Sequence, residues 1–107
     1  MIHDIGIGNI KNGDKGIAVC RPSVLGNPFP TSPTRNRQQS IKLYDAWLVE
    51  QLKTDTPQRQ EIERLAILAT KEEYDILCYC MPLDCHTTIV RREIIKMAEA
   101  LTNESTQ

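Results

Sequence analysis

The segment Tyr74–Cys80 limits the choice of fold more than any other part of the chain. It is short, rich in residues that favour β-structure, and partly apolar on both sides of an extended strand. A strand with one solvated face would alternate apolar and polar side chains, whereas a strand inside an α/β sheet is apolar almost throughout. The segment therefore predicts a buried central strand.

This strand leads through a proline-containing turn into a helix. Met81–Asp84 turns the chain, because proline fits neither the middle of a sheet nor the interior of a helix. Apolar side chains then recur at helical spacing, at Ile89, Val90, Ile94, Ile95, Met97, Ala98 and Leu101. We expect residues 102–107 to form a frayed C-terminal tail.

Two further strands are predicted near the start of the chain. Ile2–Ile10 alternates loosely between apolar and small residues, and Ile17–Cys20 is a second short apolar run. The residues between them, Asn12–Gly16, are dense in turn formers. The pattern predicts a strand, a hairpin-like turn and a second strand.

Two helices are predicted between these strands and the central one. Helical spacing begins at Asn36 and continues to about Lys53, with Asn36 or Thr34 available as the N-cap. Pro57 suits the first turn of another helix, because the N–H group that proline lacks has no partner at that position. The apolar side chains Tyr44 and Trp47 lie at helical spacing, which is typical of core residues.

We therefore predict an α/β fold, a small single-domain layered sheet with flanking helices in the order strand–strand–helix–helix–strand–helix. The chain has 107 residues, of which 40% are hydrophobic, so it can bury a core without disulfides or a structural metal. Residues 1–101 form this single domain, and residues 102–107 form the tail.

A proline-rich segment between Arg21 and Thr34 excludes both helix and strand and predicts a long loop, which in a small domain is usually functional. The loop supplies a cation, a hydroxyl, a flexible backbone position, an amide and an aromatic ring, at Arg21, Ser23, Gly26, Asn27 and Phe29. These groups suit a loop that wraps a phosphate or a sugar. The alternative is an ordered surface loop in which polar side chains satisfy the loop's own backbone and the ring anchors it.

The segment Cys78–His86 is the most specific motif. A strand that turns at Pro82 and enters a helix places the turn residues at the carboxyl edge of a sheet, where α/β domains bind ligands. The start of a helix offers free N–H groups and favours anions. Cys85 and His86 are therefore candidates for ligand contact. Arg35 and Arg37 would add positive charge at the same edge of the sheet.

Other interpretations of this motif remain open. Cys78, Cys80, Cys85 and His86 offer the ligand types of a zinc site, but adjacent residues rarely both reach one ion and the usual pair of two-residue gaps is absent. Cys78 and Cys80 can equally be small buried hydrophobes. His86 can be a hydrogen-bonded structural histidine. We expect no bound metal and no cofactor.

The charge balance and the hydropathy exclude several partners. With 13 basic and 14 acidic residues the net charge is −1, which disfavours duplex DNA and acidic membranes. No apolar run is long enough to span a bilayer, and the first residues do not form a signal peptide. We expect a cytoplasmic protein with reduced thiols. A homo-oligomer remains compatible with the sequence.

The order of motifs resembles a family of phage and bacterial domains, the domain-of-unknown-function family 4326. The resemblance spans about Val19 to Ile95 and rests on Arg21-Pro22-Ser23, Leu25-Gly26-Asn27-Pro28-Phe29, Arg37, Tyr44, Trp47-Leu48 and Leu77 to His86. The chain departs mildly from the family pattern at Cys20, often glycine there, and at Tyr79, commonly tryptophan there. The resemblance implies a compact α/β domain but no activity.

From the residues, we expect the protein to bind a nucleotide or a nucleotide-derived small molecule. The expected ligand-binding residues are Arg21, Ser23, Gly26, Asn27, Phe29, Arg37, Pro82, Cys85 and His86. The phage character of the resemblance suggests, by analogy, an anti-defence role that sequesters a host immune signalling nucleotide. The alternative is a small enzyme of nucleotide or nucleoside metabolism, with Cys85 as nucleophile or His86 as acid/base. A zinc-stabilised interaction module is the third interpretation.

Overall fold

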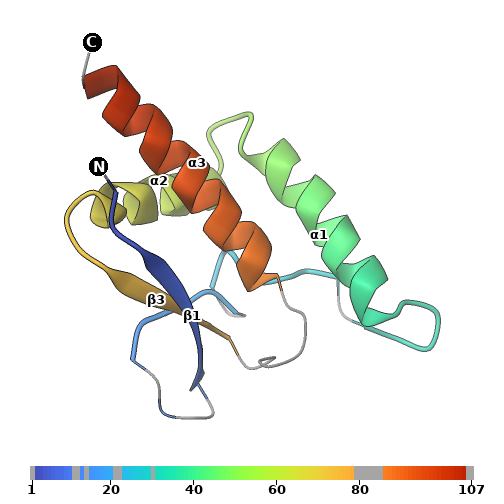
Figure 1. Cartoon of the computed structure of the whole chain (residues 1–107). Helices are drawn as coiled ribbons and strands as arrows, with labels where there is room; N and C mark the ends of the chain where they lie inside the picture. The colour runs from blue at the N-terminus through green and yellow to red at the C-terminus, as the bar shows by residue number, and fades with distance from the viewer. Residues whose placement is uncertain are drawn as a thin grey trace.

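The computed structural model describes residues 2–10, 13, 15–20, 23–29, 31–78 and 86–105. The elements follow the predicted order (Figure 1): β1 (Ile5–Asn9), β2 (Ile17–Ala18), α1 (Arg37–Gln51), α2 (Pro57–Ala69), β3 (Tyr74–Cys78) and α3 (Thr87–Ser105). The α/β fold class is confirmed. The last helix is longer than predicted, since it continues from Leu101 through Ser105 into the expected tail.

The sheet confirms β3 as the central strand. Its strand order is β1-β3-β2, and β1 and β2 both run parallel to β3. Ile7 and Ile17 are both in register with Ile76, from opposite sides.

The predicted hairpin between the first two strands is wrong. β1 and β2 do not pair with each other, because β3 lies between them. The turn formers show that the chain bends there, but they do not show where the next strand goes. With a strand on each side, the buried β3 has partners for the backbone groups at both of its edges.

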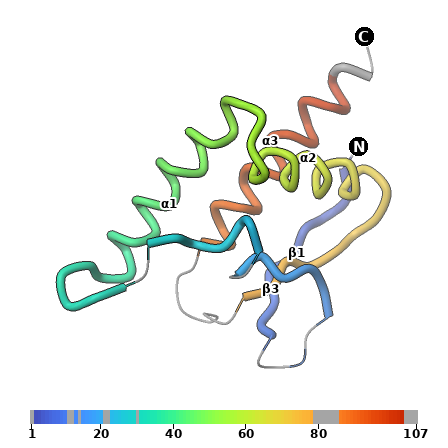
Figure 2. The backbone as a smooth tube through the Cα atoms, turned by 180° about the vertical axis from the view of Figure 1, so that it is seen from behind, coloured from blue at the N-terminus to red at the C-terminus, as the bar shows by residue number. Residues whose placement is uncertain are grey.

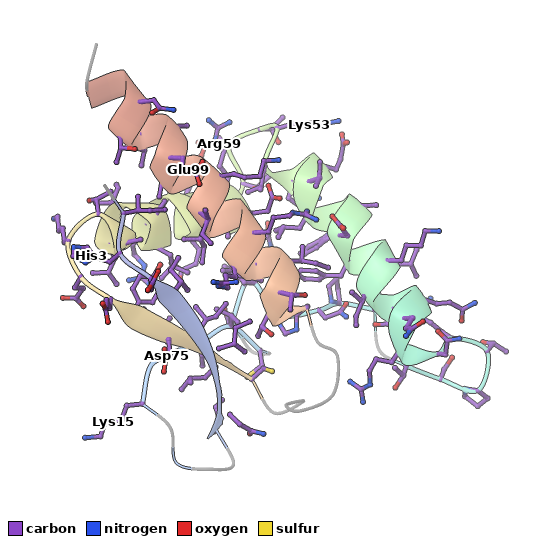
Figure 3. The ribbon with its side chains drawn as sticks, in the orientation of Figure 1. His3, Lys15, Lys53, Arg59, Asp75 and Glu99 are labelled. Carbon is purple, nitrogen blue, oxygen red and sulfur yellow. The ribbon has the colours of Figure 1, made fainter. Side chains whose placement is uncertain are left out.

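The two faces of the sheet differ in character. Side chains alternate along a strand, and Ile5, Ile76 and Cys78 share a face that is buried against the helices. The Tyr74 hydroxyl on this face donates to the Leu65 carbonyl of α2 at 2.6 Å. Figures 1 and 2 show α2 and α3 crossing each other beside the sheet. Asp75 points the other way, with its side chain exposed to solvent (Figure 3).

The helix boundaries follow local signals in the sequence. Asn36 caps α1 in a capping box, in which its side chain accepts from the Gln39 N–H while the Gln39 side chain accepts from the Asn36 N–H. Thr56 caps α2, and Pro57 occupies the first helical turn as predicted. These caps start the helices at the residues where the apolar periodicity begins.

Candidate functional site

Through a hydrogen bond, His86 connects the start of α3 to the carboxyl end of β2. Its ring nitrogen Nε2 lies 2.7 Å from the carbonyl oxygen of Val19, which follows β2, and a carbonyl can only accept, so Nε2 is the donor. The His86 carbonyl accepts the backbone N–H groups of Ile89 and Val90, both at 3.0 Å. The side chain is only 6% exposed. This geometry matches the structural alternative for His86, because Nε2 is already hydrogen-bonded.

Tyr44 of α1 joins the two sequence motifs. Its ring meets the His86 ring edge-on at a centroid distance of 5.0 Å. Its hydroxyl donates to the Leu25 carbonyl of the proline-rich loop at 2.6 Å, in a buried environment. The loop and the start of α3 are therefore both held by Tyr44. The contacts of Tyr44 agree with the expectation that the loop and the start of α3 meet at the carboxyl edge of the sheet.

The polar side chains of the loop stabilise its own backbone. The Ser23 hydroxyl accepts the Leu25 N–H at 3.2 Å, and Asn27 Oδ1 accepts the Phe29 N–H at 2.8 Å. The Gly26 N–H donates to the Ser23 carbonyl at 2.9 Å, which closes a turn. These contacts match the alternative in which the segment is an ordered surface loop. Ligand contact by these side chains stays a prediction from the sequence.

Ser40 is a residue of this region that the sequence reasoning missed. It accepts a hydrogen bond from Asn27 Nδ2 at 2.9 Å and donates to the Phe29 carbonyl, so it ties α1 to the loop. The signal was present, because Ser40 begins a buried row with Tyr44 and Leu48 at four-residue spacing. A hydroxyl in such a row indicates a buried hydrogen bond.

The aromatic and cationic side chains lie beside this cluster. The Phe29 ring meets Trp47 edge-on at 6.3 Å, and the Arg35 guanidinium carbon lies 5.8 Å from the centroid of Phe29. Trp47 is partly buried and packs against the core, in line with its predicted role. Arg37 begins α1, about 10 Å along the helix axis from Tyr44 at 1.5 Å per residue.

Several predicted site residues lie outside the described residues: Arg21, Cys80, Pro82 and Cys85. Cys78 is fully buried at the end of β3, which confirms its interpretation as a small buried hydrophobe. Cys20 is half-buried and is not in a disulfide. Among the residues that the structure describes, no group of three His, Cys, Asp or Glu side chains could hold a metal ion.

Thr87, the first residue of α3, is the other residue of this region that the sequence reasoning passed over. It is fully buried, and its Oγ1 has no hydrogen-bond partner in the part of the chain that the structure describes. It begins the inward row of α3 that continues with Val90 and Ile94. A hydroxyl thus stands where an aliphatic side chain would pack.

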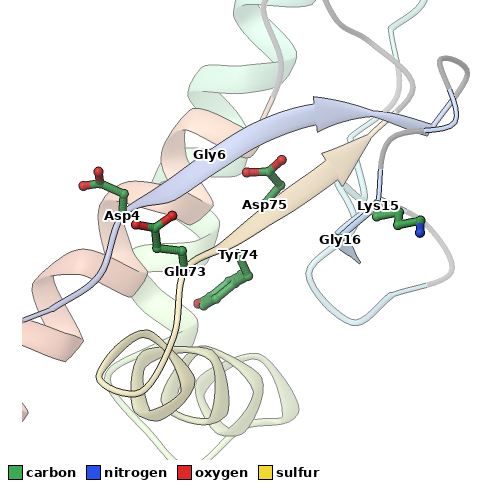
Figure 4. A pocket seen from close by; sticks show the side chains of 7 residues that line it. All are labelled: Asp4, Gly6, Lys15, Gly16, Glu73, Tyr74 and Asp75. Atoms are coloured by element: carbon green, nitrogen blue, oxygen red, sulfur yellow. The ribbon is translucent and has the colours of Figure 1, made fainter.

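A groove of about 500 Å³ lies elsewhere, on the open face at the amino end of the strands (Figure 4). Its lining comprises Asp4, Gly6, Lys15, Gly16, Glu73, Tyr74 and Asp75, and it includes none of the predicted site residues. The lining carries three carboxylates and one ammonium group, so the groove has a negative charge and repels the anionic ligand that the loop motif suggests. We place the candidate site at the carboxyl edge and not in this groove.

Comparison with known proteins identifies a family for most of the chain. Residues 8–96 match the family model "Domain of unknown function (DUF4326)". No curated protein and no solved structure matches the chain. Within the described ranges, no helix is both long enough and apolar enough to cross a membrane.

Proposed function

Because the chain belongs to the DUF4326 family, whose description names no activity, we propose a function from the site itself: binding of an anionic, nucleotide-like small molecule at the carboxyl edge of the sheet. The observation that carries this proposal is the position of the α3 start. The His86–Val19 hydrogen bond holds it beside the carboxyl end of β2. Ligands of open α/β sheets bind at this edge, and the first turn of a helix attracts anions.

The charges around this edge support an anionic ligand. Arg35 and Arg37 lie at the start of α1, next to the loop that Tyr44 and Ser40 hold in place. Arg21 lies in the same segment of the sequence, directly after Cys20. Guanidinium groups grip phosphate with paired hydrogen bonds, so arginines are the cations expected beside a nucleotide phosphate.

Binding without turnover is the better supported form of this function. A catalytic histidine must exchange a proton with the substrate, whereas His86 is only 6% exposed and its Nε2 donates to Val19 inside the fold. The enzyme alternative needs either Cys85, which lies outside the described residues, or the second ring nitrogen of His86. In a phage, a protein that binds without turnover would sequester a host signalling nucleotide, and this is the biological role that we propose.

The test identifies the ligand that the protein binds and asks whether this ligand is released chemically unchanged. Protein incubated in a nucleotide-rich lysate is examined by native mass spectrometry, and the complex is then denatured by heat. We expect a phosphorylated ligand of unchanged mass to be released. Release of a converted product would favour the enzyme, and failure to capture any nucleotide would overturn the proposal.

Arginine variants then locate the site by titration calorimetry against the captured ligand. Arg21→Ala and Arg37→Ala should each weaken binding roughly tenfold or more, because a charge-assisted hydrogen bond is lost. Arg21→Lys should recover only part of the affinity, since lysine lacks the planar fork. Arg64→Ala on α2 is the matched control, because Arg64 pairs with Glu61 on that helix. Equal binding by all four folded variants would place the ligand elsewhere.

A further inference from the structure

The buried hydroxyl of Thr87 is the polar group that the fold leaves unexplained. Its side chain is 0% exposed, and Oγ1 lacks a hydrogen-bond partner within the described residues. Buried hydroxyls are nearly always hydrogen-bonded, because an unsatisfied one destabilises the folded state. Valine has the same shape and would fill this position without that penalty. The presence of threonine here therefore indicates a hydrogen-bond partner that the described residues do not supply.

The position of Thr87 shows what kind of partner fits. It is the first residue of α3, a helix of 19 residues, and side chains in a helix lean toward its N-terminus. Its Cα–Cβ bond is therefore tilted toward the helix start. The N–H groups of Ile89 and Val90 already donate to the His86 carbonyl. Thr87 adds a further donor where the helix dipole favours negative charge. A group that only accepts hydrogen bonds and carries negative charge is complementary to this position.

We propose that the Thr87 hydroxyl donates to a phosphate group of the ligand, seated at the start of α3. This inference rests on the proposed function and deepens it, because it assigns the phosphate, and not the base or the sugar, to this helix. The ligand class narrows accordingly to phosphorylated compounds, with unphosphorylated nucleosides excluded.

The test compares Thr87→Val with its neighbour Thr88→Val, an exposed residue of the same type. Thr87→Val should raise the Tm of the free protein, because an unsatisfied hydroxyl is replaced by a methyl group of the same size. The same variant should bind inorganic phosphate and a nucleoside monophosphate roughly tenfold more weakly. Thr87→Ser keeps the hydroxyl and should bind both probes like the parent, whatever its Tm. Thr88→Val should bind both probes like the parent.

Binding of inorganic phosphate, a nucleoside monophosphate and the corresponding nucleoside is followed by NMR chemical shifts of the α3 amides. A lower Tm for Thr87→Val would show that the hydroxyl has a partner within the fold and would overturn the inference. Unchanged phosphate affinity in that variant would also overturn it. If the parent binds the nucleoside as tightly as the monophosphate, the inference fails while nucleotide binding stands. If it binds none of the three probes, the proposed function fails as well.

Discussion

Gly6 and Gly16 lie on either side of Asp75 on the open face of the sheet, and each has a different reason to be glycine. A side chain at Gly16 would overlap the backbone carbonyl of Asp75, which cannot move without disturbing β3. A side chain at Gly6 would overlap only the Asp75 carboxylate, the mobile end of an exposed side chain. The absence of a Cβ is therefore structurally required at Gly16 and dispensable at Gly6.

Alanine substitutions at these glycines should separate the two cases. Gly16→Ala should lower the free energy of unfolding by about 1–3 kcal/mol, the usual effect of forcing extra atoms into a packed site. Gly6→Ala should have an effect below about 1 kcal/mol, because the carboxylate can rotate away into solvent. Urea denaturation of both variants measures the difference. A larger loss at Gly6 than at Gly16 would contradict this explanation.

Among the helices, α1 and α3 are joined by an ion pair that depends on pH. Arg92 contacts Asp45 with two nitrogens, at 2.6 and 3.0 Å, and its Nε donates to the buried Glu93 at 2.7 Å. The hydrogen bonds from Arg92 hold the pKa of Asp45 below its ordinary value. A carboxyl whose folded pKa is lowered stabilises the fold above its unfolded pKa, and this stabilisation is lost as the pH falls through the folded pKa.

Asp45→Asn should therefore destabilise the protein at neutral pH and not in acid. Because the Asp45 side chain is 40% exposed, we expect a loss of less than about 1 kcal/mol at pH 7. The difference from the parent should shrink below about pH 4, the ordinary pKa of an aspartate, and vanish at lower pH. Thermal unfolding of both proteins from pH 7 to pH 2.5 measures this difference in stability. Glu50→Gln, which breaks an exposed pair with Lys53 just beyond the end of α1, is the control. A deficit of Asp45→Asn that persists in acid would argue against the ion pair.

The Tyr44 hydroxyl is one of the links between α1 and the loop, and it can be removed while the ring is kept. Tyr44→Phe keeps the ring against His86 but leaves the buried Leu25 carbonyl without its donor. We expect a loss of about 1–3 kcal/mol in unfolding free energy, and faster proteolysis within residues 23–29. Tyr74→Phe is the control, since its hydroxyl bonds to a helix carbonyl in a part-buried site and should matter less. Equal losses in both variants would show that the Tyr44 contact has no special role.

At the scale of the whole molecule, one hydrophobic cluster joins the sheet to all the helices. Its buried members come from β1, β3, α1, α2 and α3, with Val19 and Leu25 from the segments between them. A core that draws on every helix can support a small domain without covalent staples. Of the cysteines that the structure describes, neither Cys20 nor Cys78 is in a disulfide.

Treatment with a chelator and a reducing agent should consequently leave thermal unfolding nearly unchanged. We expect the Tm to shift by less than about 2 °C, because a structural zinc site or a disulfide would contribute several kcal/mol, each worth several degrees in a domain of this size. Scanning calorimetry with and without EDTA, and separately with a reductant, measures this shift. A large loss of Tm in EDTA would revive the zinc-stabilised module, whose proposed ligands include Cys80 and Cys85.

The sequence by itself determined the local features of this protein. The order of elements, the cap at Asn36, the start of α2 at Pro57 and the buried central strand all follow from signals within a few residues of each feature. Only the tertiary structure decided that β1 and β2 lie on opposite sides of β3 and that His86 bonds to Val19. The physical reason is separation along the chain. A hydrogen bond between residues 67 positions apart leaves no periodicity or spacing in the sequence, so the use of a polar side chain within the fold appears only once its distant partner is in place.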